Sequence, residues 1–233
     1  MEYFYTLPEL VLPPSLVIEG DEFVHLTHVM RKQAGDAISV VDGRGNVYET
    51  VLEKIVQRSA VCRITRQSVA ANEPAVQLTL GVALLKSGSR FDLLVEKAVE
   101  LGVHTLVPVL TERTIPRKTK VDRWQKIALA AMKQSGRAVL PAVKPLIMFQ
   151  EFLLDAGGSE GRFIPHEKIS RPLLRETCTE EQSRVTVCVG PEGGFSDEEI
   201  RLAVNAGFTP VSLGPRRLRA ETAAIVAAAT ILI

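Results

Sequence analysis

The stretch "VTVCVGPEGGFSDEEI", Val185–Ile200, contains the pattern of a strand, a turn and the start of a helix. An apolar, β-rich run ends at Gly190, and a turn rich in glycine follows it. Ser196 and Glu199 then form an S-x-x-E capping box, which is typical of a helix N-terminus. Glycines between a strand and a helix allow the backbone to approach a ligand closely. The stretch therefore predicts a binding loop in a sheet flanked by helices.

The same alternation extends outward from this stretch over the region after residue 76. Strand patterns and helix patterns follow one another there, which predicts an α/β fold with a mostly parallel sheet. The next predicted strand also ends in Gly-Pro, in "VSLGPRRLRAETA", residues 211–223. If the two strands are neighbours, both turns lie at one edge of the sheet and can share a ligand. Two ordinary tight turns are the alternative.

The residues of the first turn argue against a phosphate ligand. The phosphate-loop pattern G-x-x-x-x-G-K-[ST] is absent, and so is a clean G-x-G-x-x-G. Glu192 would place negative charge where a pyrophosphate binds. A ligand that is neutral or partly cationic suits the loop better, and S-adenosylmethionine (SAM), with its sulfonium, is one. The pattern excludes phosphates more firmly than it selects SAM.

The first 70 residues have a different pattern, with short β runs around one predicted helix. Asp42-Gly43-Arg44-Gly45-Asn46 is a strong hairpin signal between two of these runs. The small polar stretch of residues 68–76 contains a proline and marks a boundary. We therefore expect a small β-barrel-like domain over residues 1–70 and an α/β domain over residues 75–233.

Composition excludes several classes of protein. No apolar run reaches the roughly 20 residues that span a bilayer, so we expect no membrane segment. The three cysteines form no C-x-x-C pair, so we expect neither a disulfide framework nor a metal site, and the cytoplasm is the expected compartment. Residues 111–144 contain nine basic residues and two acidic ones. This segment is either a solvated surface or a surface that contacts phosphates.

Several motifs together resemble one known family. "VGPEGGFSDEEI" and "LGPRRLRAETAAIVA" resemble the two C-terminal motifs of the RsmE family in the SPOUT superfamily. "LLKSGSRFDLLVEKAVELGVHTLVPVLTERT" and "ALAAMKQSGRAVLPAV" resemble its central motifs, and "HVMRKQAGDAISVVDGRG" resembles its N-terminal module. Members of that family methylate N3 of a uridine in bacterial 16S ribosomal RNA. The resemblance covers nearly the whole chain.

The resemblance implies a particular architecture and particular partners. The C-terminal domain would be a SPOUT-type parallel sheet with a deep trefoil knot, and the N-terminal domain a PUA-like β-barrel that binds RNA. The protein would form a homodimer, use SAM without a metal, and act on 16S rRNA in the assembled 30S subunit. A different SPOUT RNA methyltransferase, acting on a ribose 2′-hydroxyl or another base, is an alternative. A non-enzymatic RNA-binding module is another.

The resemblance also assigns residues to the cofactor. The SAM pocket would have three walls, each formed where a predicted strand ends. The residues assigned to them are Ile164, Pro165, His166, Glu167, Gly190, Glu192, Gly193, Gly194, Leu213, Gly214, Leu218 and Arg219. We expect Gly193 and Gly194 to adopt positive φ angles.

Arg219 and Glu221 are the candidates for catalysis, because the uracil N3–H must lose its proton or be held as a developing anion. Glu221 could instead be a first-turn acid that favours the helix dipole. The residues assigned to RNA are basic or amide side chains, namely Arg31, Lys32, Arg113, Arg117, Gln134 and Arg137. We expect Arg137 to lie in a loop and to reach a phosphate or a flipped-out base. Each basic residue taken singly is an ordinary solvated charge in the alternative interpretation.

Overall fold

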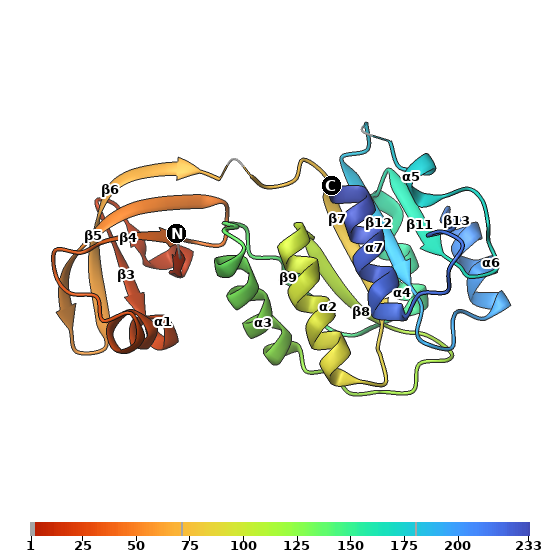
Figure 1. Ribbon diagram of the computed structural model, residues 1–233, viewed down its shortest axis with the longest axis horizontal. Helices are drawn as coiled ribbons and strands as arrows, with labels where there is room; N and C mark the ends of the chain where they lie inside the picture. Colours follow the sequence, from red (N-terminus) through yellow and green to blue (C-terminus); the bar gives the residue numbers. More distant parts are fainter. Residues whose placement is uncertain (1–2, 71, 180) are drawn as a thin grey trace. The chain divides into compact units, whose positions relative to one another are not determined.

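The computed structural model describes residues 3–70, 72–179 and 181–233, and its chain divides into two compact units (Figure 1). The N-terminal unit comprises Met1–Glu73 and Leu129–Leu140. The C-terminal unit comprises Pro74–Ala128 and Pro141–Ile233. Residues 129–140, which the sequence pattern places in the second domain, therefore group with the N-terminal unit.

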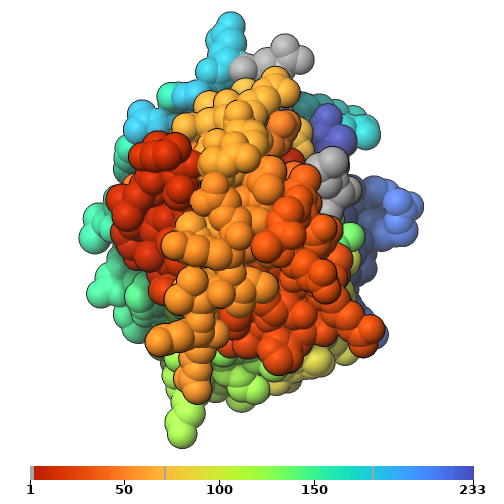
Figure 2. All heavy atoms as spheres, turned by 90° about the vertical axis from the view of Figure 1, so that its left-hand side faces the viewer, coloured from red at the N-terminus to blue at the C-terminus, as the bar shows by residue number. Residues whose placement is uncertain are grey.

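The N-terminal unit is built on a mainly antiparallel sheet. Its strands are β1 (Tyr3–Tyr5), β2 (Val11–Leu12), β3 (Ser15–Glu19), β4 (Ala37–Val41), β5 (Asn46–Val56) and β6 (Ser59–Val69). They lie in the order β1-β4-β5-β6-β3-β2, and only the β1–β4 pair among these neighbours is parallel. Figure 2 shows one face of the first segment of this unit, coloured from red to light orange. Two further elements belong to this unit. One is a short 3₁₀ turn, η1 (Pro8–Leu10), and the other is a helix that begins as α1 (Gly20–Val24) and continues as the π-helical turn η2 (His25–Val29).

The predicted hairpin joins β4 to β5 and is organised by one carboxylate. Asp42 is 4% exposed, and its Oδ1 accepts hydrogen bonds from the backbone N–H groups of Arg44 and Asn46. Its Oδ2 accepts from the Asn46 side chain at 2.7 Å and from the Tyr48 hydroxyl at 3.2 Å. An aspartate that bonds its own following backbone favours a tight turn. The hairpin prediction is confirmed.

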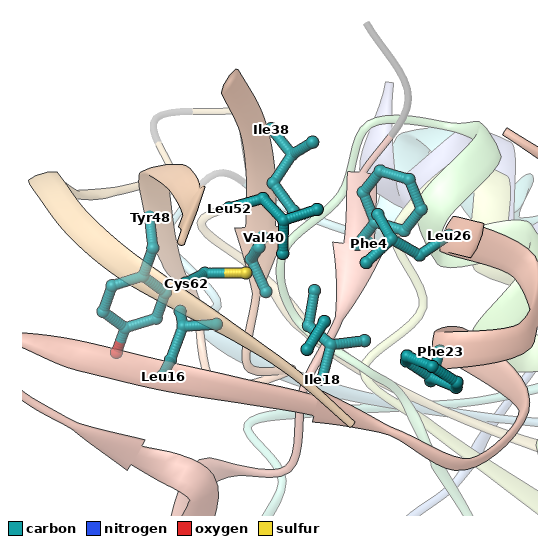
Figure 3. Packing of buried hydrophobic residues seen from close by; sticks show 11 residues of the cluster. Phe4, Leu16, Ile18, Phe23, Leu26, Ile38, Val40, Tyr48, Leu52 and Cys62 are labelled. Atoms are coloured by element: carbon teal, nitrogen blue, oxygen red, sulfur yellow. The ribbon is translucent and has the colours of Figure 1, made fainter. Parts of the chain in front are cut away.

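The core of this unit lies between the sheet and the α1–η2 helix (Figure 3). The buried side chains come from β1, β3, β4, β5, β6 and the helix, and include Phe4, Leu16, Ile18, Phe23, Leu26, Ile38, Val40, Tyr48, Leu52 and Cys62. Burial raises the pKa of the Cys62 thiol to about 11. This cysteine therefore acts as a small apolar side chain rather than as a reactive thiolate.

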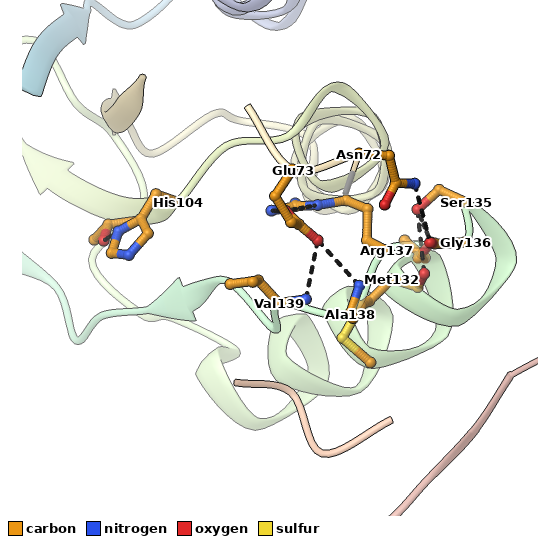
Figure 4. Close-up of polar contacts among 11 residues, drawn as sticks. Asn72, Glu73, His104, Met132, Ser135, Gly136, Arg137, Ala138 and Val139 are labelled. Carbon is orange, nitrogen blue, oxygen red and sulfur yellow. Dashed lines mark hydrogen bonds and ion pairs between the residues drawn. The ribbon is translucent and has the colours of Figure 1, made fainter. Parts of the chain in front are cut away.

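The second segment of the N-terminal unit is attached to the first by Glu73 (Figure 4). Glu73 Oε1 accepts the backbone N–H groups of Ala138 and Val139, both at 3.0 Å. Glu73 Oε2 accepts from Arg137 Nε at 3.0 Å and from Nη2 at 2.8 Å. We call these four residues the Glu73 clamp. Lys133 adds an ion pair with Glu22, and both side chains are mostly buried.

The C-terminal unit contains a parallel sheet. Its strands are β7 (Gln77–Ala83), β8 (Thr105–Leu110), β9 (Ala142–Val143), β10 (Ile147–Met148), β11 (Gly161–Pro165), β12 (Arg184–Val189) and β13 (Thr209–Val211). The order is β10-β8-β7-β12-β11-β13, β9 pairs with β8, and each of these pairs is parallel. The predicted α/β class is confirmed. The two strands that end in Gly-Pro are not neighbours, however, because β11 lies between them.

Helices pack against both faces of this sheet. The helical elements of this unit are α2 (Gly88–Leu101), α4 (Phe149–Asp155), the 3₁₀ turn η3 (Ala156–Gly158), α5 (Leu174–Thr177), α6 (Asp197–Asn205) and α7 (Ala220–Leu232). A further helix, α3 (Val121–Gln134), begins in this unit and ends in the N-terminal unit. On one face, α4 and α6 pack with Val109, Ile164 and Cys188. The ring of Phe152 in α4 lies so close to Gly81 that a Cβ at Gly81 would meet it at 2.3 Å. On the other face, α2 and α7 lie side by side (Figure 1).

Candidate functional site

The loops that follow β11, β12 and β13 lie at one edge of the sheet and enclose a pocket of about 660 Å³. We call residues 190–196 the first glycine loop, residues 166–173 the middle loop and residues 212–219 the second glycine loop. Most of the lining comes from these loops: Pro165, His166, Glu167, Lys168, Ile169, Val189, Gly190, Pro191, Glu192, Gly194, Phe195, Ser212, Leu213, Gly214, Pro215, Arg216, Arg217, Leu218, Arg219, Ala220 and Ala223. The volume falls in the range of small-molecule sites.

The first glycine loop has a backbone that only small residues permit at two positions. Gly194 has a φ of +68°, which L side chains rarely adopt. A Cβ on Gly190 would lie 3.0 Å from the ring of Phe195, which is buried. The loop ends in the predicted cap, where Ser196 Oγ accepts the N–H of Glu199 and Glu199 Oε2 accepts the N–H of Ser196. The positive φ expected at Gly193 is not found.

Three further hydrogen bonds hold the first glycine loop to neighbouring segments of the C-terminal unit. Glu192 Oε1 accepts the backbone N–H of Lys86 at 3.0 Å, in the loop between β7 and α2. Arg113 Nη1 donates to the carbonyl of Gly193 at 2.9 Å. The N–H of Glu112 donates to Glu199 Oε1 at 2.8 Å. Groups that are far away in the sequence therefore hold this loop in the absence of a ligand.

The middle loop supplies the wall between the two glycine loops. Its start is fixed by the backbone, since the His166 N–H donates to the carbonyl of Val211 at 3.0 Å. Burial lowers the pKa of His166 below its ordinary value, and the charge of Lys168 lowers it further. Lys168 in turn pairs with Asp197 at 2.7 Å and thereby lowers the pKa of that carboxyl. Both effects favour the neutral form of the His166 imidazole.

The second glycine loop has fewer contacts of its own. Ser212 Oγ accepts the N–H of Gly214 at 3.2 Å, and Gly214 has a φ of +117°. Arg217 Nε lies 3.3 Å from Glu167 Oε2 across the pocket, but both side chains are more than half exposed. Such a pair contributes little to stability.

The pocket combines apolar surface with charges of both signs. Val189, Leu213 and Leu218 are among its apolar lining residues, Glu167 and Glu192 are carboxylates, and the basic lining residues are Lys168, Arg216, Arg217 and Arg219. Backbone groups at the loops complete the lining. This arrangement suits a small ligand that has a flat apolar part together with a cationic and an anionic group.

The two residues predicted to be catalytic lie in different environments. Arg219 is exposed, lines the pocket and is the N-cap residue of α7. Glu221 does not line the pocket. It is 6% exposed, and its Oε1 lies 3.5 Å from Nε of Arg90 in α2. Within the described residues, its Oε2 has no hydrogen-bond partner.

Of the residues predicted to bind RNA, Arg137 is not available at the surface. It lies in a loop as expected, but it is 5% exposed and is held by Glu73. Arg31, Arg117 and Gln134 are exposed and Lys32 is half-buried. Arg31 has a φ of +52°, a conformation that is uncommon for arginine and that is often found at functional positions. Arg113 is exposed and also contacts the first glycine loop.

Two predicted cofactor residues lie outside the pocket lining. Ile164 is fully buried in the core, because both faces of the parallel sheet are covered. Gly193 is turned so that its carbonyl accepts Arg113. Glu167, predicted in the third wall, lines the pocket. The sequence interpretation missed Lys168 and Arg217, which directly follow or adjoin predicted residues, and it assigned no role to Lys86 and Arg90, which lie in one of the central motifs.

Two features are absent from the described residues. No group of three or more His, Cys, Asp and Glu side chains among them could hold a metal ion. No helix in the described part of the chain is long and apolar enough to cross a membrane.

Comparison with known proteins identifies relatives over nearly the whole chain. Residues 72–232 match the model of an RNA methyltransferase domain, and residues 18–65 match an RNA methyltransferase PUA domain. The ribosomal RNA small subunit methyltransferase E of Synechocystis is 35% identical over 96% of this chain and 75% of its own length.

Solved structures with the same fold hold a ligand. A ribosomal RNA small subunit methyltransferase E from Neisseria gonorrhoeae, bound to SAM, superposes with a TM-score of 0.87 at 32% identity, over 98% of this chain and 95% of that one. A methyltransferase from Legionella pneumophila, also in complex with SAM, gives 0.86 at 29% identity, over 98% and 96%.

Proposed function

This chain belongs to the ribosomal RNA small subunit methyltransferase E family, and we propose that it transfers the methyl group of SAM to N3 of a uridine in 16S rRNA. The observation that carries the proposal is the single pocket that both glycine loops line, together with the wall from Pro165 and His166.

The residues present fit SAM. Leu213 and Leu218 offer apolar surface for the adenine, and the loop backbone offers hydrogen-bonding groups for its edge. Glu167 and Glu192 offer negative charge to the cationic part of the ligand, and the basic lining residues offer positive charge to its carboxylate. When bound, SAM supplies the activated methyl group.

The protein's own residues have two tasks in this reaction. The first is to hold the reacting nitrogen in line with the methyl carbon, which lowers the barrier by prior orientation. The second is to stabilise the negative charge that develops on the uracil as N3 loses its proton. We assign the second task to Arg219, which is cationic and exposed at the pocket. Glu221, buried beside Arg90, is assigned a supporting task rather than direct contact with the base.

The RNA contacts we assign lie in both parts of the chain. Arg31 and Lys32 belong to the PUA-like N-terminal module, and Arg113, Arg117 and Gln134 belong to the basic region around α3. We assign Arg137 to the Glu73 clamp instead. The substrate we propose is the assembled 30S subunit, the active form a homodimer with a trefoil-knotted C-terminal domain, and the compartment the cytoplasm.

The test is methylation of small subunits that lack the modification. The protein is incubated with labelled SAM and such subunits, and the modified nucleoside is identified by mass spectrometry. We expect 3-methyluridine, and we expect Arg219→Ala to reduce its rate of formation by about 100-fold, as for other groups that stabilise a developing anion. Label in a ribose methyl group or in another base would replace the proposed target. If the protein binds the subunits but transfers no methyl group, it is a binding module and not an enzyme.

A further inference from the structure

Arg90, in the first turn of α2, belongs to a central motif but has no role in the site described so far. Its Nε is 3.5 Å from Oε1 of Glu221, in the first turn of α7. The Arg90 side chain is 39% exposed, whereas that of Glu221 is 8% exposed. Within the described part of the chain, the Arg90 side chain makes no other ion pair or hydrogen bond. Its remaining N–H groups are therefore available to another molecule.

Two anchors connect this turn to the cofactor pocket. Glu192, which lines the pocket, accepts the N–H of Lys86, two residues before α2 begins at Gly88. Glu221 directly follows Ala220, which also lines the pocket. The first turn of α2 is thus held on one side by the first glycine loop and on the other by the helix that follows the second glycine loop. Figure 1 shows α2 and α7 side by side and running in the same direction.

The charges of this arrangement favour an external acceptor. A buried carboxylate with one long contact is poorly compensated, and Glu221 Oε2 has no hydrogen-bond partner among the described residues. A stronger internal ion pair would use both oxygens and two nitrogens of the guanidinium. Arg90 instead keeps a partly exposed guanidinium whose charge is offset by Glu221. Such a group can donate to an oxygen without a large penalty for removing it from water.

We propose that Arg90 contacts the RNA substrate, donating to an oxygen acceptor beside the methylated position, and that Glu192 and Glu221 are positioning residues that hold it there. This inference rests on the proposed function, because it takes RNA as the molecule that meets the pocket. The acceptor is either a carbonyl oxygen of the target base or a phosphate oxygen next to it.

The first experiment compares Arg90→Met, Arg90→Lys and the control Arg184→Met. Arg184 has a similarly long ion pair, 3.8 Å from Glu160, but it begins β12, at the strand end opposite the pocket. We expect Arg90→Met to lower kcat/KM for 30S subunits by about 10- to 100-fold, the effect of losing a hydrogen bond from a charged group. The Kd of SAM by calorimetry should stay within about twofold, and Arg184→Met should resemble the wild type.

Two outcomes decide the role of Arg90. If Arg90→Met methylates as fast as an active wild type, the inference is wrong while the proposed function stands. If the wild type itself transfers no methyl group, the proposed function fails, and binding of 30S subunits by wild type and Arg90→Met still tests the contact. Arg90→Lys should recover part of the rate, whereas a merely structural ion pair would show its loss in the melting temperature alone.

Salt dependence distinguishes the two acceptors. A phosphate contact contributes to counterion release, so Arg90→Met should reduce the slope of log K against log salt by about one. A contact with the base carbonyl should lower kcat and leave that slope unchanged.

The second experiment tests Glu192 with Glu192→Gln and Glu192→Ala. Glutamine keeps an oxygen that can accept the Lys86 N–H, and alanine does not. Both variants remove the charge that Glu192 offers to SAM, so both should bind SAM more weakly. Only Glu192→Ala also leaves the Lys86 N–H without its acceptor, and at saturating SAM we expect its kcat/KM for 30S subunits to lie about tenfold below that of Glu192→Gln. Equal losses in both variants would show that the negative charge itself is needed, and the positioning role would be wrong.

Discussion

The two glycine loops line one pocket but are held in different ways. The first loop is fixed by protein groups at several points: the capping box at Ser196, the carboxylates of Glu192 and Glu199, and Arg113. In the second loop, Ser212 is held at the start by backbone hydrogen bonds with Pro172 and Leu174 and accepts the N–H of Gly214. Beyond Gly214, the loop adds the exposed ion pair of Arg217 with Glu167. From this difference we expect the first wall of the pocket to be preformed by folding, and the part of the second loop after Gly214 to become more ordered when the ligand binds.

The largest change in stability is expected when Glu199, which holds the end of the first loop, is removed. Glu199→Ala leaves the N–H groups of Glu112 and Ser196 without an acceptor, which should lower the free energy of unfolding by about 3 kcal/mol. Urea denaturation measures it. Glu198→Ala is the matched control, because Glu198 is an exposed neighbour that pairs with Arg201. Its effect should stay within about 0.5 kcal/mol. A similar loss of stability in both variants would show that the Glu199 carboxylate does not hold the first loop.

The second loop should respond to the ligand instead. Trypsin can cleave after Arg216, Arg217 and Arg219, which are all exposed. If cleavage needs a state that cannot bind SAM, SAM at 100 times its Kd should slow it by about 100-fold, equivalent to about 2.7 kcal/mol. Cleavage after Arg58, in the turn between β5 and β6, is the internal control and should not change. Equal rates with and without SAM would mean that the second loop is as preformed as the first.

A glycine substitution in the first loop should weaken SAM binding more than it lowers the stability of the fold. Gly194→Val places a β-branched side chain at a φ of +68°, and that strain should raise the Kd of SAM by about tenfold. Gly35→Val, at a φ of +98° with open space around it, imposes similar strain in the N-terminal unit. Calorimetry should find an unchanged Kd for this control. If Gly194→Val also binds SAM normally, the loop is more adaptable than its contacts indicate.

The smallest effect concerns pH at the wall between the loops. The folded state lowers the pKa of His166 below 6.5, so the unfolded chain takes up this proton at a higher pH than the folded one. Stability should therefore be full above about pH 6.5 and decrease as the pH falls below it. The change should stay below about 1 kcal/mol, because the ring is partly exposed. His166→Asn should lack this decrease in denaturation curves between pH 7.5 and 5.5, and identical curves would contradict it.

The sequence predicts the local features of this site well. Gly190, Ser196 and Gly214 are recognisable because turn and cap preferences act over a few residues. The order of strands is a tertiary property, so the position of β11 between β12 and β13 could not be read locally. Arg137 and Glu221 carry the same lesson, since each looks like a solvent-facing or catalytic charge until its partner, Glu73 or Arg90, is known.

The Glu73 clamp can form only after a long part of the chain has been synthesised. Arg137 follows Glu73 by 64 residues, which take a ribosome about 3 to 13 seconds to add. During that interval the strands of the N-terminal sheet already exist, but Glu73 lacks its partners and the Gly45 N–H lacks the carbonyl of Ala138. A fragment that stops at residue 73 would remain at this stage. The N-terminal unit is thus completed by Leu129–Leu140, which lie in the sequence between the two segments of the C-terminal unit.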